Sequence, residues 1–324
     1  MSYLVTGVAG FIGFHTCHRL LQRGESVIGI DVVNNYYDPA LKEARLRILA
    51  EFPGFIFHRT DVGERIGMEA VAKQHPEITN IIHLAAQAGV RHSLSHPYEY
   101  IHSNVDGQMV MLEVARHLKQ CGHFVYASSS SVYGGNTKLP FSVDDRVDSP
   151  LSLYAATKRA GELMAHCYSS LYSFPTTGLR FFTAYGPWGR PDMAAFLFVK
   201  AILEGQPIQV FNRGDMRRNF TFIDDIVGGV LAVSDKPPTS SEALARIYNI
   251  GNDRSEPLGR YISVIEQCLG MKAEIIYEPL QAGDVKETYA DIEPLRRDFG
   301  YNPATTIDEG LPRFVEWYRG YYNV

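Results

Sequence analysis

The fold is decided by the run Tyr3-Leu4-Val5-Thr6-Gly7-Val8-Ala9-Gly10-Phe11-Ile12-Gly13. An apolar stretch leads into a glycine-rich turn and a helical pattern, and a second apolar stretch ends at Asp31. This order predicts a βαβ unit that opens on a phosphate-binding turn. Gly7 permits the turn, Gly10 leaves room for a pyrophosphate, and Gly13 lets the helix pack on the strand. The helix that starts at Phe11 and Ile12 directs its free N–H groups at the phosphates.

An acidic residue marks the end of the second predicted strand. Asp31 lies eighteen residues after Gly13, where a carboxylate can accept both hydroxyls of an adenosine ribose. The same carboxylate repels a 2′-phosphate, and Val32, Val33 and Asn34 offer no cation to bind one. The sequence therefore predicts NAD rather than NADP as the cofactor, with Asn34 among the residues that contact it.

Size and composition are those of a soluble globular protein with two domains. The chain has 324 residues, a hydrophobic fraction of 45% and a net charge of -5 without long charged blocks, so nucleic acid is not expected as a partner. No apolar run reaches the length of a membrane span, and the first residues do not resemble a signal peptide. The four cysteines lack metal or redox spacing. We expect reduced thiols in the cytoplasm, no membrane association and no metal site.

Strand and helix patterns alternate up to residue 182. Strands are predicted over residues 55–59, 80–84, 121–127 and 176–182, and helices over 40–51, 97–117 and 152–172. This alternation predicts an α/β fold, a Rossmann-type doubly wound parallel sheet. We assign residues 1–182 to an NAD-binding domain and 183–324 mainly to a smaller mixed α/β substrate domain, with parts of 224–251 returning to the first. On the helix over 40–51, Lys42 and Arg45 could reach the adenosine phosphate side, but we interpret them as a solvated face.

Several residues at strand ends are candidates for the cofactor site, because ligands bind at the carboxyl ends of parallel strands. Asp61 and Val62 follow the third strand, and Asp61 either accepts the adenine amino group or caps a helix. The remaining cofactor candidates are Leu84, Ala85, Ala86 and Gln87 after the fourth strand and Asn104 on a helix. His83 lies on that buried strand, and we interpret it as a core histidine with a hydrogen-bond partner.

The chemistry points to Tyr154 and Lys158, which lie four residues apart on one helix and so share a face. A phenol has a pKa of about 10, and a nearby ammonium and a positive nicotinamide ring both lower that pKa. Four serines, Ser128 to Ser131, follow the fifth strand and can bind the reacting oxygen. This arrangement predicts removal of a proton from an alcohol while its carbon gives hydride to NAD.

With these residues in place, the chain resembles the extended short-chain dehydrogenases/reductases that modify nucleotide sugars. The resemblance rests on the runs at 6–13, 83–86, 154–158 and 218–225, and it covers essentially the whole chain. Within this branch the chain is most similar to UDP-glucuronate 4-epimerases, through residues 34–40, 87–91, 181–193 and 283–291. Ala184 and Asn219 depart from the usual valine and aspartate of these enzymes.

The resemblance implies a redox-neutral reaction with tightly held NAD. Ser129, Tyr154 and Lys158 are the implied catalytic residues, although Ser128 and Ser130 are open alternatives for the hydroxyl. UDP-glucuronate would become UDP-galacturonate through a transient 4-keto intermediate. Related dehydratases and decarboxylases carry acids where this chain has Ser130 and Ser131, and serine cannot perform their proton transfers at the neighbouring carbons. Ser130 is also an expected substrate contact.

The substrate contacts are expected in the second half of the chain. Thr183 stands where UDP-galactose 4-epimerases resemble one another in having asparagine, and Arg190 lies seven residues later in the same loop. We expect these two residues to bind the uronate carboxylate, unless Arg190 is a surface residue. The remaining candidates, each with domain packing as its alternative, are Arg91 and Arg218 for the pyrophosphate, Asp284 for the uridine ribose, and Gln209 and Phe211 for the uracil.

Two helices have broad apolar faces that either cover the sheet or form a homodimer through a four-helix bundle, as the resemblance implies. The faces contain Val110, Met111 and Val114 on one helix and Leu163, Met164, Cys167 and Tyr168 on the other. The alternative functions are a 4-epimerase of a neutral UDP-hexose, a UDP-glucuronate decarboxylase, and a non-catalytic NAD-binding module. The presence of both Tyr154 and Lys158 argues against the last.

Overall fold

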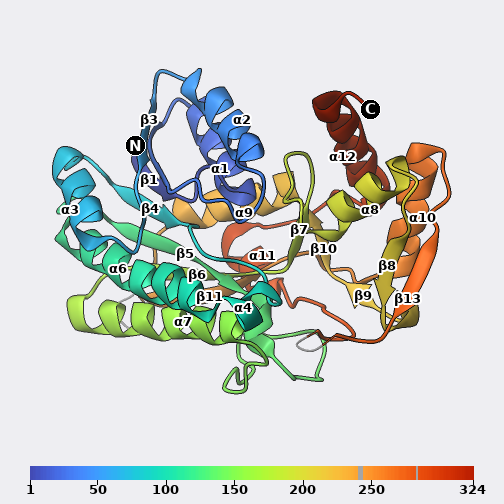
Figure 1. Ribbon diagram of the computed structural model, residues 1–324. Helices are drawn as coiled ribbons and strands as arrows, with labels where there is room; N and C mark the ends of the chain where they lie inside the picture. Colours follow the sequence, from blue (N-terminus) through green and yellow to red (C-terminus); the bar gives the residue numbers. More distant parts are fainter. Residues whose placement is uncertain (240–243, 282–283) are drawn as a thin grey trace.

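The fold is built on a seven-stranded parallel sheet (Figure 1). The computed structural model describes residues 1–239, 244–281 and 284–324, so Gly283 lies outside the described residues. The strand order is β11-β6-β5-β4-β1-β2-β3. These strands are β1 (Ser2–Thr6), β2 (Ser26–Asp31), β3 (Phe55–Arg59), β4 (Asn80–His83), β5 (His123–Ser129), β6 (Thr176–Phe181) and β11 (Ala245–Ile250). The predicted doubly wound α/β sheet is confirmed.

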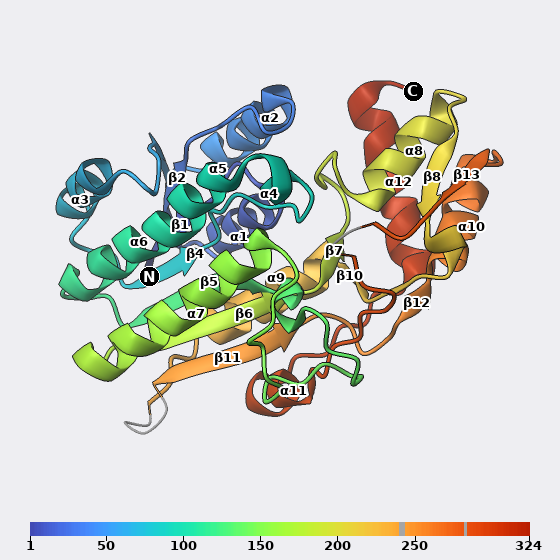
Figure 2. The same ribbon diagram turned by 60° about the horizontal axis from the view of Figure 1, so that its bottom comes forward.

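Both faces of the sheet are covered by helices, because successive side chains of each strand point to opposite faces. Tyr3 and Val5 of β1 belong to one hydrophobic core, whereas Leu4 belongs to the other. The first core includes side chains of α1 (Phe11–Gln22), α2 (Pro39–Ala50) and α9 (Ile223–Ser234). The second includes side chains of α3 (Arg65–Gln74), α6 (Gly107–His117) and α7 (Leu153–Tyr172). Figure 2 shows α6 and α7 side by side on this second face.

Two elements differ from their predicted bounds. The helix expected over 97–117 consists of α5 (Pro97–Tyr100), a π-helical segment (Ile101–Asp106) and α6, and the short α4 (His92–Ser95) precedes it. The fifth strand begins at His123 and continues to Ser129, beyond the predicted end. The ladder extends because Ser128 and Ser129 pair with β6, so these two serines belong to the strand.

The second lobe contains short paired strands and, among the described residues, the helices α8 (Ala194–Leu203), α10 (Leu258–Leu269) and α12 (Ile307–Tyr322). β7 (Thr183–Tyr185) pairs with β10 (Phe220–Phe222), and β8 (Ile208–Phe211) pairs with β13 (Ile275–Glu278), both in parallel. The antiparallel pair is β9 (Arg217–Arg218) with β12 (Glu256–Pro257). α11 (Glu293–Phe299) instead packs on α9 and β11 of the first lobe. Single 3₁₀ turns cover Ser130–Tyr133 in the first lobe and Asn212–Gly214 in the second. No helix in the described part of the chain is both long and apolar enough to cross a membrane.

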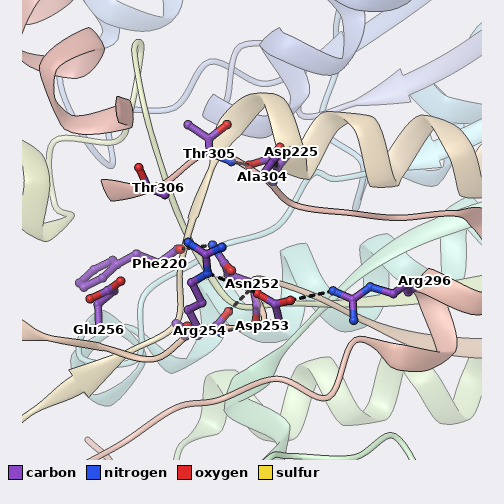
Figure 3. A network of polar contacts seen from close by, with 12 residues as sticks. Phe220, Asp225, Asn252, Asp253, Arg254, Glu256, Arg296, Ala304, Thr305 and Thr306 are labelled. Carbon is purple, nitrogen blue, oxygen red and sulfur yellow. Dashed lines mark hydrogen bonds and ion pairs between the residues drawn. The ribbon is translucent and has the colours of Figure 1, made fainter. Parts of the chain in front are cut away.

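The chain returns to the first lobe after β10. α9 packs on α1, and β11 adds a parallel edge strand beside β6. A polar network fixes the turn after β11: Asn252 donates to the Phe220 carbonyl at 3.3 Å, and Arg296 donates to Asp253 at 2.7 Å (Figure 3). We therefore propose that the NAD-binding domain combines residues 1–182 with most of 223–251, while the remaining residues after 183 form the substrate domain.

Candidate active site

A cavity of about 1210 Å³ opens along the carboxyl edge of the sheet and is lined by both lobes. With one exception it brings together every residue predicted for the site. Those that line it are Gly7, Gly10, Phe11, Ile12, Gly13, Asp31, Asn34, Asp61, Val62, Leu84, Ala85, Ala86, Gln87, Arg91, Ser129, Ser130, Tyr154, Lys158, Thr183, Arg190, Gln209, Phe211, Arg218 and Asp284. The exception is Asn104.

The glycine-rich turn has the shape that a pyrophosphate requires. Gly7 has a φ of +75°, and a Cβ added at Gly13 would lie 2.0 Å from the Gly7 carbonyl oxygen. Gly10 is the N-cap of α1 and offers no side chain to its free N–H groups. Those groups remain available to an anion at the positive end of the helix. The turn therefore fits the diphosphate of a dinucleotide.

Asp31 is held by the backbone at the end of β2. Its two carboxylate oxygens accept from the backbone N–H groups of Ala9 at 3.0 Å and Val33 at 2.8 Å. Burial raises the pKa of Asp31, and the Val33 N–H and the charge of Lys42 oppose this rise. Because a carboxylate oxygen has more than one lone pair, both oxygens can still accept from a ribose.

The interpretation of Lys42 and Arg45 as a solvated face is wrong, since both side chains are buried. Lys42 lines the cavity and donates to the Asn34 carbonyl at 2.8 Å, and burial lowers its pKa to about 8. Arg45 donates to the carbonyls of Ala9 at 2.7 Å and Trp188 at 2.6 Å. The helix buries this face because the loop that contains Trp188 folds back over it, and no local pattern shows that contact.

Asn104 does not line the cavity but lies behind Gln87, which does. It accepts from the Gln87 backbone N–H at 2.8 Å, and its amide donates to the Gln87 carbonyl and to Thr157, each at 3.0 Å. Asn104 therefore contacts Gln87 rather than the cavity, and we propose that it supports the cofactor site through Gln87 instead of by the direct contact predicted. Gln87 lines the cavity, and Asn104 holds its backbone through both the N–H and the carbonyl.

The other strand-end residues have local partners. Asp61 accepts from the Gly63 N–H at 2.8 Å and lies 3.2 Å from His102. His83 is buried and hydrogen-bonded to Thr6 at 2.7 Å, and burial lowers its pKa to about 3. The predicted core histidine is thus confirmed, and it is held in the neutral form at neutral pH.

Tyr154 and Lys158 project from the first turns of α7. Ser152 caps this helix by accepting from the Ala155 N–H at 3.1 Å, which fixes where the helix begins. The Lys158 ammonium donates to the Ala127 carbonyl at 2.9 Å, and burial lowers its pKa to about 8. This contact anchors the ammonium at the carboxyl end of β5.

The Tyr154 hydroxyl lines the cavity and is shielded from solvent by its surroundings. Burial raises its pKa, whereas a hydrogen bond with Ser129 and the charge of Arg190 act in the opposite direction. The lowered pKa expected from the sequence is therefore not a property of the chain alone. It needs a further positive charge in the cavity, such as a nicotinamide ring.

The structure distinguishes Ser128 from Ser129, which the sequence left as alternatives for the catalytic hydroxyl. Ser128 and Ser129 are neighbours on β5 and so point to opposite faces. Ser128 donates to Glu162 at 2.6 Å, whereas Ser129 faces Tyr154 and caps the following turn through the Ser131 N–H. Ser129 is thus the serine that shares a hydrogen bond with the tyrosine.

A buried charged network behind these serines was missed from the sequence. Glu162 accepts from Arg180 at 2.8 and 3.0 Å, and Arg180 also donates to the Tyr133 hydroxyl at 3.0 Å. Tyr133 in turn donates to Asn249 of β11 at 2.6 Å. Glu162 lies eight residues after Tyr154, on the same helix, but only the sheet brings Arg180 to it. This network stabilises the carboxyl end of β5 on the side away from the cavity.

Arg190 lies in the cavity and is ion-paired. It donates to Asp192 through Nε at 3.0 Å and through Nη2, and Tyr36 donates to the same carboxylate at 3.0 Å. Although burial works against it, the Asp192 carboxylate raises the pKa of Arg190. Nη1 remains available to a second anion. Tyr36 and Asp192 are additional lining residues that the sequence did not indicate.

The far end of the cavity is rich in arginine. Arg91 pairs with Asp284 at 3.2 Å and lies over the Phe211 ring at 4.5 Å. Arg218 donates only to backbone carbonyls among the described residues, those of Arg217 and Lys286, and burial lowers its pKa against the attraction of Asp284. A desolvated guanidinium without a carboxylate bonded to it is suited to bind a phosphate.

Sequence comparison places the chain among nucleotide-sugar enzymes. The model of the NAD dependent epimerase/dehydratase family matches residues 3–251. Protein CapI of Staphylococcus aureus is 48% identical, over 100% of both chains. UDP-glucuronate 4-epimerase 3 of Arabidopsis thaliana is 45% identical, over 99% of this chain and 77% of its own.

Structural comparison gives the same relationship. The crystal structure of UDP-glucuronic acid 4-epimerase from Bacillus cereus, in complex with UDP-glucuronic acid and NAD, matches with a TM-score of 0.91. The two sequences are 33% identical, and the match covers 99% of this chain and 100% of that one. The similarity therefore extends through both lobes and includes the cavity between them.

Proposed function

The chain belongs to the NAD-dependent epimerase/dehydratase family, and from that premise we propose that it is an isomerase, an NAD-dependent UDP-glucuronate 4-epimerase. It converts UDP-glucuronate to UDP-galacturonate by inverting the configuration at C4. One observation carries this proposal: the Tyr154 and Ser129 hydroxyls share a cavity with the cation of Arg190. A site with both features can bind a uronate and act on its C4 hydroxyl.

The proposed mechanism assigns proton chemistry to the chain and redox chemistry to the cofactor. When bound, NAD accepts the C4 hydride and returns it to the sugar. Tyr154 takes the proton of the 4-hydroxyl and gives it back after the sugar has turned over. Ser129 donates a hydrogen bond to the reacting oxygen, and the Lys158 ammonium, held by the Ala127 carbonyl, favours the phenolate through its charge.

The uronate carboxylate is the group that Arg190 recognises in this proposal. Asp192 engages Nε and Nη2, so a substrate carboxylate meets a guanidinium that is already oriented and has Nη1 free. Thr183 lines the cavity at the start of β7 and supplies a hydroxyl donor. Pre-orientation by Asp192 lowers the entropy cost of binding the second carboxylate.

The remaining roles follow the shape of the cavity. We propose that Gly7, Gly10, Gly13 and Asp31 bind the cofactor's adenosine diphosphate, and that Asn34, Asp61 and Gln87 contact it. Arg218 and Arg91 bind the UDP pyrophosphate, with Asp284, Gln209 and Phe211 around the uridine. The ion pair between Arg91 and Asp284 must weaken when the nucleotide binds, because Arg91 then contacts the pyrophosphate and Asp284 contacts the uridine.

The absence of acids beside the serines supports an epimerase over a decarboxylase. The acidic residues that line the cavity within the described chain are Asp31, Asp61, Asp192 and Asp284. None of them lies on β5 or on the Ser130–Tyr133 turn. A 4-keto uronate therefore meets serine hydroxyls there, and their pKa is too high to assist proton transfer at C3 or C5.

A product assay tests the proposal. The purified protein is incubated with UDP-glucuronate without added NAD, and the nucleotide sugars are separated. We expect UDP-galacturonate as the product, formed with cofactor that co-purifies. Release of carbon dioxide with a UDP-pentose, or turnover of UDP-glucose in preference to UDP-glucuronate, would contradict the assignment.

Two variants test the residues. Tyr154→Phe should lower kcat by about 10²–10⁴-fold, whereas Tyr172→Phe, an exposed tyrosine on the same helix, should not change it. Arg190→Ala should raise KM for UDP-glucuronate and leave KM for UDP-glucose unaffected, whereas kcat can fall with both sugars because the Arg190 charge also acts on Tyr154. Equal rises in KM with both sugars would show that Arg190 does not recognise the carboxylate.

We also propose a homodimer formed through α6 and α7, in the cytoplasm. Val110, Met111 and Val114 are buried in a core with side chains of the sheet, so for these three residues the sheet-covering alternative holds. The exposed apolar residues of these helices are Met109, Leu163, Leu171 and Tyr172. The four cysteines are free thiols, which supports a reducing compartment. We expect the Leu171→Asp variant to be monomeric and the parent protein to be dimeric. Light scattering of both proteins tests this expectation.

A further inference from the structure

A cluster of two histidines and a glutamate lies at the mouth of the cavity, on the short helices α4 and α5. Potential ligand atoms of His92, His96 and Glu99 all lie within 4.8 Å of one another. No other group of three His, Cys, Asp or Glu residues with this spacing occurs among the residues that the structure describes. From this geometry we propose a binding site for a divalent transition-metal ion of the zinc class.

The three ligands have the chemistry that such an ion prefers. Two imidazoles and one carboxylate form a His₂Glu set, which binds Zn²⁺ with a water molecule in the fourth position. Nitrogen ligands also favour Co²⁺, Ni²⁺ and Cu²⁺ over Mg²⁺ or Ca²⁺. His92 Nε2 lies 2.9 Å from a Glu99 oxygen, so two ligand atoms already face one another and an ion can replace their hydrogen bond.

Ser95 sets the tautomer of the second histidine. Its hydroxyl donates to the His92 carbonyl at 3.2 Å and lies 2.8 Å from His96 Nδ1. The hydroxyl has a single proton, so it accepts from Nδ1–H of His96 when it donates to the carbonyl. The Nε2 atom of His96 then carries the free lone pair. A hydroxyl behind the ligating ring is a usual support of histidine–metal sites.

The first ligand is held in place by aromatic packing. The Tyr36 ring contacts His92 edge-on at 4.9 Å, and the His96 ring stacks on it at 4.0 Å with an interplanar angle of 10°. His96 is exposed and can rotate, whereas His92, which is half-buried against Tyr36, stays fixed. The site is therefore partly preorganised.

The site is separate from the proposed catalytic groups and adjoins the cavity through His92 and its supporting residue Ser95. His92 lines the cavity, whereas His96 and Glu99 do not. Substitution of His96 or Glu99 can therefore remove the metal without touching the residues assigned to the sugar or the cofactor. This arrangement makes the inference testable whether or not the proposed function is correct.

Titration with Zn²⁺ tests the site. The full chain is freed of metal with EDTA, and binding of ZnCl₂ is measured by calorimetry. We expect one ion per chain, and at least about tenfold weaker binding in His96→Gln and in Glu99→Gln, since loss of a supporting group alone has that cost. The matched control is His166→Gln, an exposed histidine on α7, which should bind Zn²⁺ as the parent does.

Cobalt provides the second readout. Co²⁺ in a site of nitrogen and oxygen ligands gives weak visible bands without thiolate charge transfer, and these bands should vanish in His96→Gln. The His96→Gln and Glu99→Gln proteins should keep the parent's melting temperature and basal turnover. The proposal is overturned if the parent shows no saturable binding, if both variants bind as it does, or if the spectrum shows a cysteine ligand.

Discussion

The Arg45 guanidinium donates a hydrogen bond of 2.6 Å to the carbonyl oxygen of Trp188. The same guanidinium donates to the Ala9 carbonyl at 2.7 Å, inside the glycine-rich turn. A single side chain of α2 therefore joins the cofactor turn to the loop that carries Arg190. Because Arg45 is fully buried, water cannot replace these bonds.

We expect Arg45→Met to destabilise the protein by about 3 kcal/mol, since it leaves buried carbonyls without donors. The matched control is Arg47→Met, an exposed arginine on the same helix, which should change stability by less than about 0.5 kcal/mol. Thermal unfolding of the three proteins makes the comparison. The KM for UDP-glucuronate should also rise in Arg45→Met alone. A melting temperature equal to that of Arg47→Met would show that the link is dispensable.

Gly13→Ala should prevent cofactor binding. The added Cβ would lie 2.0 Å from the Gly7 carbonyl oxygen, a distance that only movement of the turn can relieve. Gly228→Ala is the control, because Gly228 is an exposed helical glycine with nothing within 4 Å of its added Cβ. That control should gain about 0.5–1 kcal/mol of stability. NAD released on denaturation measures occupancy, and a full complement in Gly13→Ala would refute the predicted displacement.

Glu162→Gln should cost about 3–5 kcal/mol of unfolding free energy, because it leaves the buried charge of Arg180 without a counter-ion. Arg180 outweighs the effect of burial and keeps the pKa of Glu162 below its usual value. Glu113→Gln breaks the exposed pair with Arg116 and should cost no more than about 1 kcal/mol. Chemical denaturation measures the unfolding free energy of both variants. Similar losses of unfolding free energy in Glu162→Gln and Glu113→Gln would mean that burial does not make the Glu162–Arg180 pair more important for stability.

Two buried histidines should make the protein sensitive to mild acid. Burial lowers the pKa of His83 to about 3 and that of His123 to about 4. Both are neutral in the folded chain and take up protons on unfolding below about pH 6.5. Their contribution is therefore complete above pH 6.5 and is lost as the pH falls toward 4.

The expected slope is about 1.4 kcal/mol per pH unit for each histidine. The free energy of unfolding is measured between pH 6.5 and 4.5. Its slope against pH should be smaller in His123→Gln by the contribution of one proton, which is about 1.4 kcal/mol per pH unit. His166→Gln, which removes an exposed histidine, should leave the slope unchanged. A parent protein whose stability is flat over this range would contradict the assignment of both groups as buried neutral histidines.

The cofactor half of the site could be predicted from the sequence because its determinants are local. Gly7, Gly10, Gly13 and Asp31 lie within one βαβ unit, so chain connectivity alone brings them together. Tyr154 and Lys158 share a helix face for the same reason. Lys42 and Arg45 could not be predicted in the same way, since the segment that buries Arg45 lies more than one hundred residues later.

By itself, the sequence determined the parallel sheet, the phosphate turn, the preference for NAD and the tyrosine–lysine pair. Each depends on short-range periodicity or spacing, which the backbone converts directly into geometry. Tertiary structure alone decided that Ser129 rather than Ser128 faces Tyr154, that Asp192 orients Arg190, and that Asn104 holds Gln87 rather than lining the cavity. These choices depend on which side chains of distant segments meet, and that is settled by packing of the two lobes around one cavity.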